Sequence, residues 1–215
     1  MSTNIQDLRE DYQQSHLLLA DVNPCPVEQF NVWFEQAVAA NIKEPNAMTL
    51  ATANQSGRPS ARIVLLKGVT ENSFVFYTNY DSGKGRDLAQ NPYAALVFNW
   101  LELEKQIRIE GEVRKLDRDA SEAYFQSRPK GSQIGAWASP QSRIIPDRSV
   151  LEDKAKALKE EYLHEEQLPC PPHWGGFEVI PDRIEFWQGR SSRLHDRIAY
   201  ALQVDGSWRI DRLAP

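Results

Sequence analysis

The sequence predicts a mainly β protein with additional helices (α+β), folded as an antiparallel barrel with helices at its ends. Short segments rich in β-branched and aromatic residues follow one another along the chain, and turn-forming residues separate them. Strands and helices do not alternate regularly, so a doubly wound parallel sheet is not expected. Because no Gly-x-Gly-x-x-Gly or P-loop pattern is present, a bound nucleotide phosphate would be held largely by side chains.

Length and composition fit a single domain. The chain has 215 residues, of which 41% are hydrophobic, enough to build a core. Residues 1–24 are polar and mixed, and we expect them to form a mobile N-terminal arm. We expect residues 25–215 to form one domain.

Charge and hydropathy exclude several classes. The net charge of −5 argues against general nucleic-acid binding, which needs a broad basic face. No apolar run approaches the ~20 residues of a membrane helix, and the first residues lack the apolar region of a signal peptide. Cys25 and Cys170 have no metal-type spacing and are expected to be free thiols rather than a disulfide. We therefore expect a cytoplasmic protein with no nucleic-acid or membrane partner.

The first half of the chain predicts a helix followed by strands. Phe30, Trp33 and Phe34 have helical spacing after Pro26, which favours a helix over 26–40. Turn residues at 54–59 predict a hairpin between the first two strands. A short helix is expected over 84–90, ended by Asn91 and Pro92. The strands expected in this half cover 48–52, 60–67, 73–78, 94–100 and 106–115.

The second half predicts two helices and then four closing strands. The helices are expected over 120–126 and 149–166, and the second is long and highly charged. Asp205 and Gly206 are a strong hairpin signal between the last two strands. The closing strands are expected over 174–180, 183–187, 198–204 and 207–212.

The segment 184–197 is the most informative part of the sequence. It joins Phe186 and Trp187 to a loop that holds Arg193, His195 and Arg197. In an extended segment alternate side chains share a face, so these three groups would converge on one ligand. Such a cluster would be costly to bury without an anionic partner. The alternative is a solvated basic turn, which the two aromatic residues disfavour.

This pattern, Glu-Phe-Trp followed by Arg-x-His-x-Arg, closely resembles the signature of the pyridoxamine 5′-phosphate oxidase family of flavin enzymes. The resemblance runs from about residue 8 to residue 215. It implies a split β-barrel that binds FMN at a homodimer interface. It also implies oxidation of pyridoxamine or pyridoxine 5′-phosphate by dioxygen. By the same resemblance, Trp187 and Arg197 would flank the flavin, while Arg193 and His195 would close over the substrate as the catalytic pair.

Two cations end an apolar strand, Arg62 and Lys67. They are five residues apart, so an ideal strand directs them to opposite sides. Spacing alone favours two solvated strand-end charges. The resemblance implies instead that Arg62 binds the flavin phosphate and that Lys67 lies between the flavin and the substrate phosphate.

Further flavin contacts are implied by the resemblance. The stretch 77–84 carries hydroxyls and a lysine at a helix start, which suits a phosphate but is also typical of an ordinary turn. Gln106, on a strand, would bond the flavin ring through its amide, although its residue type alone indicates a surface side chain. Residues 141 and 142 alone indicate a polar turn. The remaining residues that the family pattern assigns to the flavin are Tyr77, Thr78, Lys84, Gln141 and Ser142.

A second set of residues matches the family's substrate site. Tyr124 and Arg128 are four apart and share a helix face, ahead of a Pro- and Gly-containing loop. An arginine there suits a phosphate, but from sequence alone it equally suits the helix dipole. The resemblance assigns Tyr124, Arg128 and Ser132, with Lys67, to the substrate phosphate.

The N-terminal arm departs from the family pattern. It lacks the arginine-rich stretch found in many members, so a secondary product site built from arm arginines is in doubt. Arg9 and Tyr12 match positions that cover the substrate, with solvated arm residues as the competing interpretation. No His, Cys, Asp or Glu spacing predicts a metal.

Two other functions remain open. One is a related split-barrel flavin reductase or oxidase with another substrate, which would not need Tyr124, Arg128, Ser132, Arg193 and His195 together. The other is a non-enzymatic carrier of flavin or pyridoxal phosphate. A visible spectrum and a peroxide assay with pyridoxamine phosphate would discriminate between them.

Overall fold

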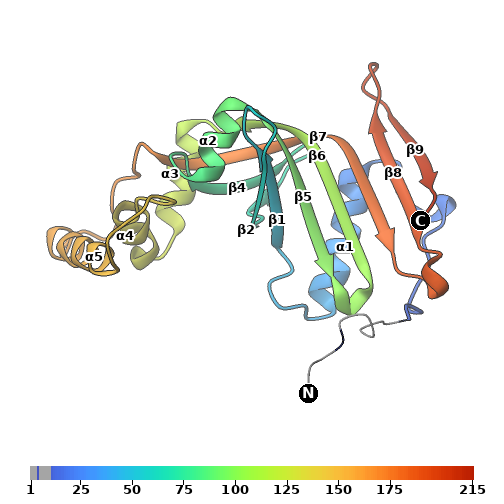
Figure 1. The fold of residues 1–215 in the computed structure, drawn as a ribbon, viewed down its shortest axis with the longest axis horizontal. Coiled ribbons are helices and arrows are strands. Elements are labelled where there is room, and N and C mark those ends of the chain that lie inside the picture. Colours follow the sequence, from blue (N-terminus) through green and yellow to red (C-terminus); the bar gives the residue numbers. More distant parts are fainter. Residues whose placement is uncertain (1–3, 5–10) are drawn as a thin grey trace. The chain divides into compact units, whose positions relative to one another are not determined.

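The computed structural model describes Asn4 and residues 11–215. Within them the chain forms five α-helices and nine β-strands (Figure 1). The helices are α1 Pro26–Ala39, α2 Gly83–Gln90, α3 Arg118–Ser127, α4 Lys130–Ala138 and α5 Ser149–Glu161. The strands are β1 Ala47–Ala53, β2 Pro59–Leu65, β3 Gly68–Val69, β4 Phe74–Asn79, β5 Tyr93–Trp100, β6 Lys105–Lys115, β7 Trp174–Gln188, β8 Asp196–Leu202 and β9 Trp208–Leu213.

The strands form one sheet, and the predicted antiparallel α+β class is confirmed. The hydrogen-bonded order is β2-β1-β5-β6-β7-β4-β3, with β8 pairing β7 and β9 pairing β8. β7 pairs antiparallel with β4 through its first half, Phe177 facing Phe76, and with β8 through its second half, Trp187 facing Arg197. The predicted hairpin of β8 and β9 is present (Figure 1). Gly206 supplies its positive φ of 83°.

The residues group into two compact units. The first comprises the described residues of Met1–Thr49 with Ala95–Glu110 and Pro181–Pro215. The second comprises Leu50–Ala94 and Gly111–Ile180. The division falls inside β1, β5, β6 and β7. The mobile arm over 1–24 and the single domain over 25–215 stay predictions.

In the first unit an aromatic core packs around α1. Phe30 and Trp33 are one helical turn apart and both are buried. Phe30 meets Phe98 at a centroid distance of 5.1 Å, and Trp33 meets Phe186 at 5.2 Å, both edge to face. The helix begins at Pro26, which suits a first helical position because that residue needs no intrahelical donor.

The second unit has its own core, formed largely by helices. Phe125, Ile134, Leu168, Cys170 and Trp174 form a buried cluster. Each helix start is fixed locally: Ser82 caps α2 by accepting from Gly85 N, and Asp117 caps α3 by accepting from Ala120 N. These caps set where the side chains of α2 and α3 lie in the candidate site.

Three predicted elements were wrong in extent or kind. The two strands expected over 174–180 and 183–187 are one strand, β7, in which Pro181 lies between the residues paired with β4 and those paired with β8. The helix expected to reach 166 ends at Glu161, and Lys130 Nζ fixes the turn that follows by donating to the carbonyls of Tyr162 and Glu165. The loop expected after Arg128 is the helix α4.

Candidate functional site

A pocket of about 640 Å³ lies within the second unit. Its walls come from the end of β2 and Lys67 just after it, from β4, from the start of α2, from α3, α4 and the loop that follows α4, and from the first residue of β7. Eight of the predicted site residues line it: Lys67, Tyr77, Thr78, Lys84, Tyr124, Arg128, Ser132 and Gln141. We call it the cationic pocket, because Lys67, Lys84 and Arg128 have no carboxylate within ion-pair distance among the described residues.

Lys84 is the buried cation of this pocket. Only 8% of the residue is exposed, and its Nζ donates to Thr78 Oγ1 at 3.2 Å and to Ser82 Oγ at 3.4 Å. Burial lowers the pKa of Lys84, and the neighbouring Arg62 cation lowers it further. A cation held by hydroxyls at a helix start is suited to an oxyanion.

Arg62 does not line the pocket, although its charge lowers the pKa of Lys84. Its guanidinium donates to Thr52 Oγ1 at 2.7 Å and to Ser60 Oγ at 2.5 Å. Its nearest carboxylate is Asp87, at 3.9 Å. Burial lowers the pKa of Arg62, and Asp87 opposes that shift. Arg62 is thus fixed in orientation by neutral groups on β1 and β2.

Residues 141 and 142 lie close to the same helix start. The Gln141 Oε1 accepts from Thr78 Oγ1 at 3.3 Å. Ser142 is exposed, has a left-handed φ of 66°, and places its Oγ 3.7 Å from where a Cβ on Gly83 would lie. Ser142 therefore borders the first residue of α2 without lining the pocket.

Arg128 supplies the cation on the helical side of the pocket. It is half-buried, and its Cζ lies 4.7 Å from the centre of the Trp174 ring. Burial lowers its pKa. Its Nη1 is buried with no hydrogen-bond partner among the described residues. Tyr124 stacks on Tyr77 at a centroid distance of 3.9 Å beside it.

Trp174 is a pocket residue that sequence reasoning missed. It is 6% exposed and lines the pocket at the first position of β7. The signal that would have indicated it is an aromatic residue directly before Gly175 and Gly176, since paired glycines mark a close approach of backbone. The remaining predicted residues of this pocket, Lys67 and Ser132, are both exposed on its rim.

A second group of predicted residues belongs to the first unit. The Trp187 ring lies 4.6 Å from the His195 ring, and Tyr12 contacts both at 5.8 Å. His195 Nδ1 accepts from the backbone N–H of Arg190 at 3.1 Å, so a neutral ring carries its proton on Nε2. Gln106 is half-buried on β6.

Arg197 is held by a buried carboxylate. Its Nε donates to Glu185 Oε1 at 2.8 Å and its Nη2 to Oε2 at 3.1 Å, a two-pronged pair. Arg108 also donates to Glu185. Burial by itself raises the pKa of Glu185, but the bonds from Arg197 and Arg108 outweigh it and leave that pKa below its ordinary value. We call Glu185, Trp187, His195 and Arg197 the C-terminal cluster.

The expected extended segment through 193–197 was wrong. Ser191–Arg193 is a 3-10 turn, in which Ser192 and Arg193 have φ values of 55° and 61°, and β8 begins only at Asp196. Arg193 is exposed, whereas His195 packs on Trp187 and Arg197 pairs with Glu185. The strand alternation that predicted one shared face therefore does not apply. Arg9 lies outside the described residues.

Three further features concern metal binding, the cysteines and the membrane. Among residues 11–215 and Asn4, no group of three or more His, Cys, Asp or Glu side chains is placed to hold a metal ion. Both cysteines are free thiols, Cys25 half-buried and Cys170 buried. None of the helices in the described part of the chain is long and apolar enough to span a membrane.

Fold and pocket together define an antiparallel sheet protein with cationic side chains around a cavity, and comparison with known proteins gives its family. Residues 34–162 match the family described as pyridoxamine 5′-phosphate oxidase, and residues 174–215 match the pyridoxine 5′-phosphate oxidase C-terminal dimerisation region. The chain belongs to the pyridoxamine 5′-phosphate oxidase family. Its predicted class, the split β-barrel, is thereby confirmed.

Similar proteins span the whole chain. A pyridoxine/pyridoxamine 5′-phosphate oxidase of Acaryochloris marina is 57% identical, covering 99% of this chain and 96% of its own length. One of Synechocystis is 56% identical, with coverages of 99% and 98%. Among solved structures, PhzG from Burkholderia lata 383, in complex with tetrahydrophenazine-1-carboxylic acid, is similar at 29% identity and a TM-score of 0.88 over 94% of this chain and 100% of its own.

Proposed function

We propose that this chain oxidises pyridoxamine 5′-phosphate or pyridoxine 5′-phosphate to pyridoxal 5′-phosphate, with FMN as cofactor and dioxygen as oxidant. The observation that carries the proposal is the cationic pocket, in which Lys67, Lys84 and Arg128 lack carboxylate partners among the described residues. Its support is membership of a family whose relatives, named for this activity, share more than half of their residues with the chain.

The residues of the pocket fit a phosphorylated flavin. An uncompensated buried cation such as Lys84 is costly unless an anion joins it. Thr78 adds a hydroxyl, the capped start of α2 adds backbone donors, and Arg62 adds a second cation nearby. We propose that these groups hold the FMN phosphate, with Tyr77, Gln141 and Ser142 as further contacts. Gln106, Trp187 and Arg197 are proposed to contact the flavin ring.

A second anion would be held by the other cations of the pocket. We propose that Lys67, Tyr124, Arg128 and Ser132 bind the substrate phosphate. The phosphate is remote from the reacting carbon, so energy from binding it would position that carbon. Two phosphate sites in one pocket explain why the lining carries three cations without carboxylate partners.

The residues proposed above would hold FMN, which would supply the two-electron redox chemistry that couples oxidation of the substrate at C4′ to reduction of dioxygen to hydrogen peroxide. The alcohol substrate yields the aldehyde directly, whereas the amine also needs one water and releases ammonia. Arg193 and His195 are proposed to close over the substrate and orient it, with His195 Nε2 as the available proton donor. Tyr12 and Arg9 are proposed to cover the substrate from the N-terminal arm.

The assembly and location are also proposals. A match of residues 174–215 to a dimerisation region supports a homodimer with composite sites. Light scattering on the flavin-loaded protein tests this, and an active flavin-loaded monomer would contradict it. A cytoplasmic location is proposed from the free thiols of Cys25 and Cys170.

The decisive experiment combines a spectrum with an assay. The purified protein should be yellow, should release FMN rather than the dinucleotide on denaturation, and should produce peroxide and pyridoxal 5′-phosphate from pyridoxamine 5′-phosphate. A flavin-loaded protein that oxidises neither phosphorylated substrate would favour the related flavin reductase or oxidase. A colourless protein that cannot be reconstituted with FMN would overturn the proposal.

A further inference from the structure

We propose that Trp174 is a positioning residue, which holds Arg128 and Tyr124 in place for a substrate phosphate and so sets the preference for phosphorylated substrates. The inference rests on the proposed function of the cationic pocket. It concerns a residue to which the sequence pattern assigned no role, although it lines the pocket and is almost fully buried.

The first step is how the Arg128 cation is held. Its guanidinium lies over the Trp174 ring, 4.7 Å from the centroid, and more distantly over Phe125 at 5.6 Å. None of the described carboxylates pairs with it. A carboxylate would orient the guanidinium equally well, but would neutralise it and occupy its donors. An aromatic face orients the cation and leaves its charge and its N–H groups available to a phosphate.

The second step is that Tyr124 is aligned by the same ring. The Tyr77 and Tyr124 rings are nearly parallel to Trp174, with interplanar angles of 12° and 9°. Tyr77 and Tyr124 stack directly on each other at 3.9 Å. The phenol of Tyr124 and the guanidinium of Arg128 therefore both pack on the Trp174 ring, and a shift of that ring would displace both.

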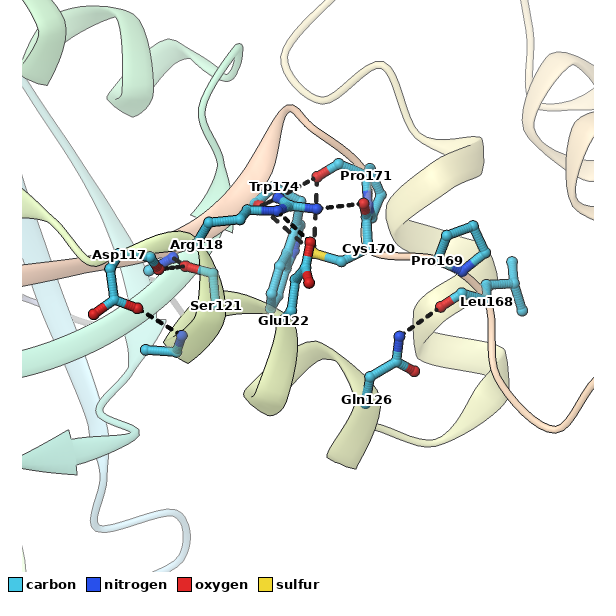
Figure 2. Close-up of polar contacts among 12 residues, drawn as sticks. Asp117, Arg118, Ser121, Glu122, Gln126, Leu168, Pro169, Cys170, Pro171 and Trp174 are labelled. Atoms are coloured by element: carbon cyan, nitrogen blue, oxygen red, sulfur yellow. Dashed lines mark hydrogen bonds and ion pairs between the residues drawn. The ribbon is translucent and has the colours of Figure 1, made fainter.

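The third step is that the backbone of Trp174 is itself fixed. Figure 2 shows Arg118, the first residue of α3, reaching the chain before β7. Its Nη1 donates to the carbonyls of Pro171 at 3.0 Å and Trp174 at 3.2 Å, and its Nη2 to that of Cys170 at 2.5 Å. Glu122 pairs with its Nε at 2.6 Å. The helix that carries Tyr124 and ends directly before Arg128 thus also anchors the residue that aligns them.

The chain directly after Trp174 has little room to move. A Cβ on Gly175 would lie 2.1 Å from the hydroxyl oxygen of Tyr80, and one on Gly176 would lie 2.6 Å from Leu116 Cδ1. Only glycine permits this approach of β7 to its neighbours. Trp174 is consequently held on both sides, by Arg118 before it and by close backbone packing after it.

The test compares Trp174→Leu, which removes the aromatic face, with Trp174→Phe, which keeps a weaker one. Both are assayed as flavin-loaded protein with pyridoxamine 5′-phosphate and with unphosphorylated pyridoxamine. Equilibrium binding of 4-deoxypyridoxine 5′-phosphate, which cannot be oxidised at C4′, and of its unphosphorylated form provides a second readout. Trp137→Leu is the matched control, because Trp137 packs against the same buried cluster and bonds to Pro169 O at 2.7 Å but does not line the pocket.

Trp174→Leu should raise KM and Kd for the phosphorylated ligands by about tenfold, and Trp174→Phe by about threefold. Values of kcat, and the binding of the unphosphorylated ligands, should stay within about twofold. Trp137→Leu should lower Tm without changing the ratio of KM or Kd between phosphorylated and unphosphorylated ligands. Equal weakening of phosphorylated and unphosphorylated ligands, or the same loss in the control, would overturn the inference.

Two further outcomes are informative. If Trp174→Leu does not fold, Trp174→Phe decides, and an unchanged preference for phosphate in that variant contradicts the role. If the wild-type protein turns over neither substrate, the proposed function fails, yet binding of 4-deoxypyridoxine 5′-phosphate still tests Trp174.

Discussion

The cationic pocket and the C-terminal cluster differ in whether their cations have carboxylate partners. In the pocket, Lys84 is buried against hydroxyls and Arg128 against an aromatic ring, with no carboxylate paired to either among the described residues. In the C-terminal cluster, Glu185 takes bonds from Arg197 and Arg108. An uncompensated cation is costly to the folded protein but available to a ligand, whereas a paired cation stabilises its surroundings. Cations without a carboxylate partner are therefore available to bind an anion, whereas cations paired with a carboxylate stabilise the fold.

The comparison is tested most strongly by substituting one charged residue in each region. Glu185→Gln should lower the free energy of unfolding by about 3 kcal/mol, because it leaves two guanidinium groups around a neutral buried amide. That value is at the low end for a buried pair, since Arg108 and Arg197 are 40% and 24% exposed and water can reach them. Lys84→Met should instead leave stability unchanged or slightly higher, because a buried unpaired cation is removed.

Urea unfolding of the flavin-free protein at pH 7 measures both variants. The pKa of Glu185 is depressed in the folded state, so its contribution is present above the ordinary carboxyl range and is lost as pH falls through the folded pKa. The gap between wild type and Glu185→Gln should therefore narrow in acid. A loss in Lys84→Met as large as that in Glu185→Gln would remove the distinction between the regions.

The second prediction compares two arginines of one segment, of which one has a carboxylate partner and the other has none in the described part of the chain. Arg193 is exposed and has no ion pair among the described residues, whereas Arg197 is paired with Glu185. Arg193→Leu should lower kcat/KM by roughly 30-fold, equivalent to about 2 kcal/mol for a charged hydrogen bond, with flavin still bound. Arg197→Leu should weaken flavin binding and lower stability.

Flavin fluorescence titration and kcat/KM with pyridoxamine 5′-phosphate separate the two roles. Tm of the flavin-free protein adds a third readout, on which Arg193→Leu should have little effect, as is usual for an exposed side chain. If Arg193→Leu loses flavin but turns over normally once flavin is saturating, the assigned roles are reversed.

Most of the fold could be predicted because its signals are local. The caps of α2 and α3, the Pro26 helix start and the Asp205-Gly206 turn each act within a few residues. Pro181 led to the wrong prediction of two separate strands, because proline usually interrupts a strand. In the structure it lies within β7, between the residues paired with β4 and those paired with β8, and the sequence does not define this pairing.

The candidate site was predictable as a list of residues but not as an arrangement. Family resemblance named eight residues that share one pocket, although sequence spacing alone favoured solvated ends for Lys67. Trp174 was missed because its role depends on contacts with residues 46 and 50 positions earlier in the chain, Arg128 and Tyr124. The left-handed turn at Ser192 could not be anticipated either, since non-glycine residues seldom adopt it.

The last prediction concerns a cation in the first unit that resembles those of the pocket. Lys105 is 9% exposed, bonds to the Gln36 amide oxygen and lies 4.5 Å from the centre of the Trp33 ring. Burial lowers its pKa to about 8. His16 and Asp21 line the same cavity, but neither forms an ion pair with it.

Because the folded pKa of Lys105 lies below the ordinary lysine value, the unfolded chain holds more protons between about pH 8 and 10. Stability should therefore rise with pH in that window, by about 1 kcal/mol between pH 8 and 9. Lys105→Met should remove this gain and be more stable than wild type at pH 7. Urea unfolding of both proteins at pH 7, 8 and 9 measures the difference, in which the remaining lysines cancel. Parallel pH profiles would mean that folding does not lower the pKa of Lys105, and that a buried cation without a carboxylate partner does not by itself destabilise this protein.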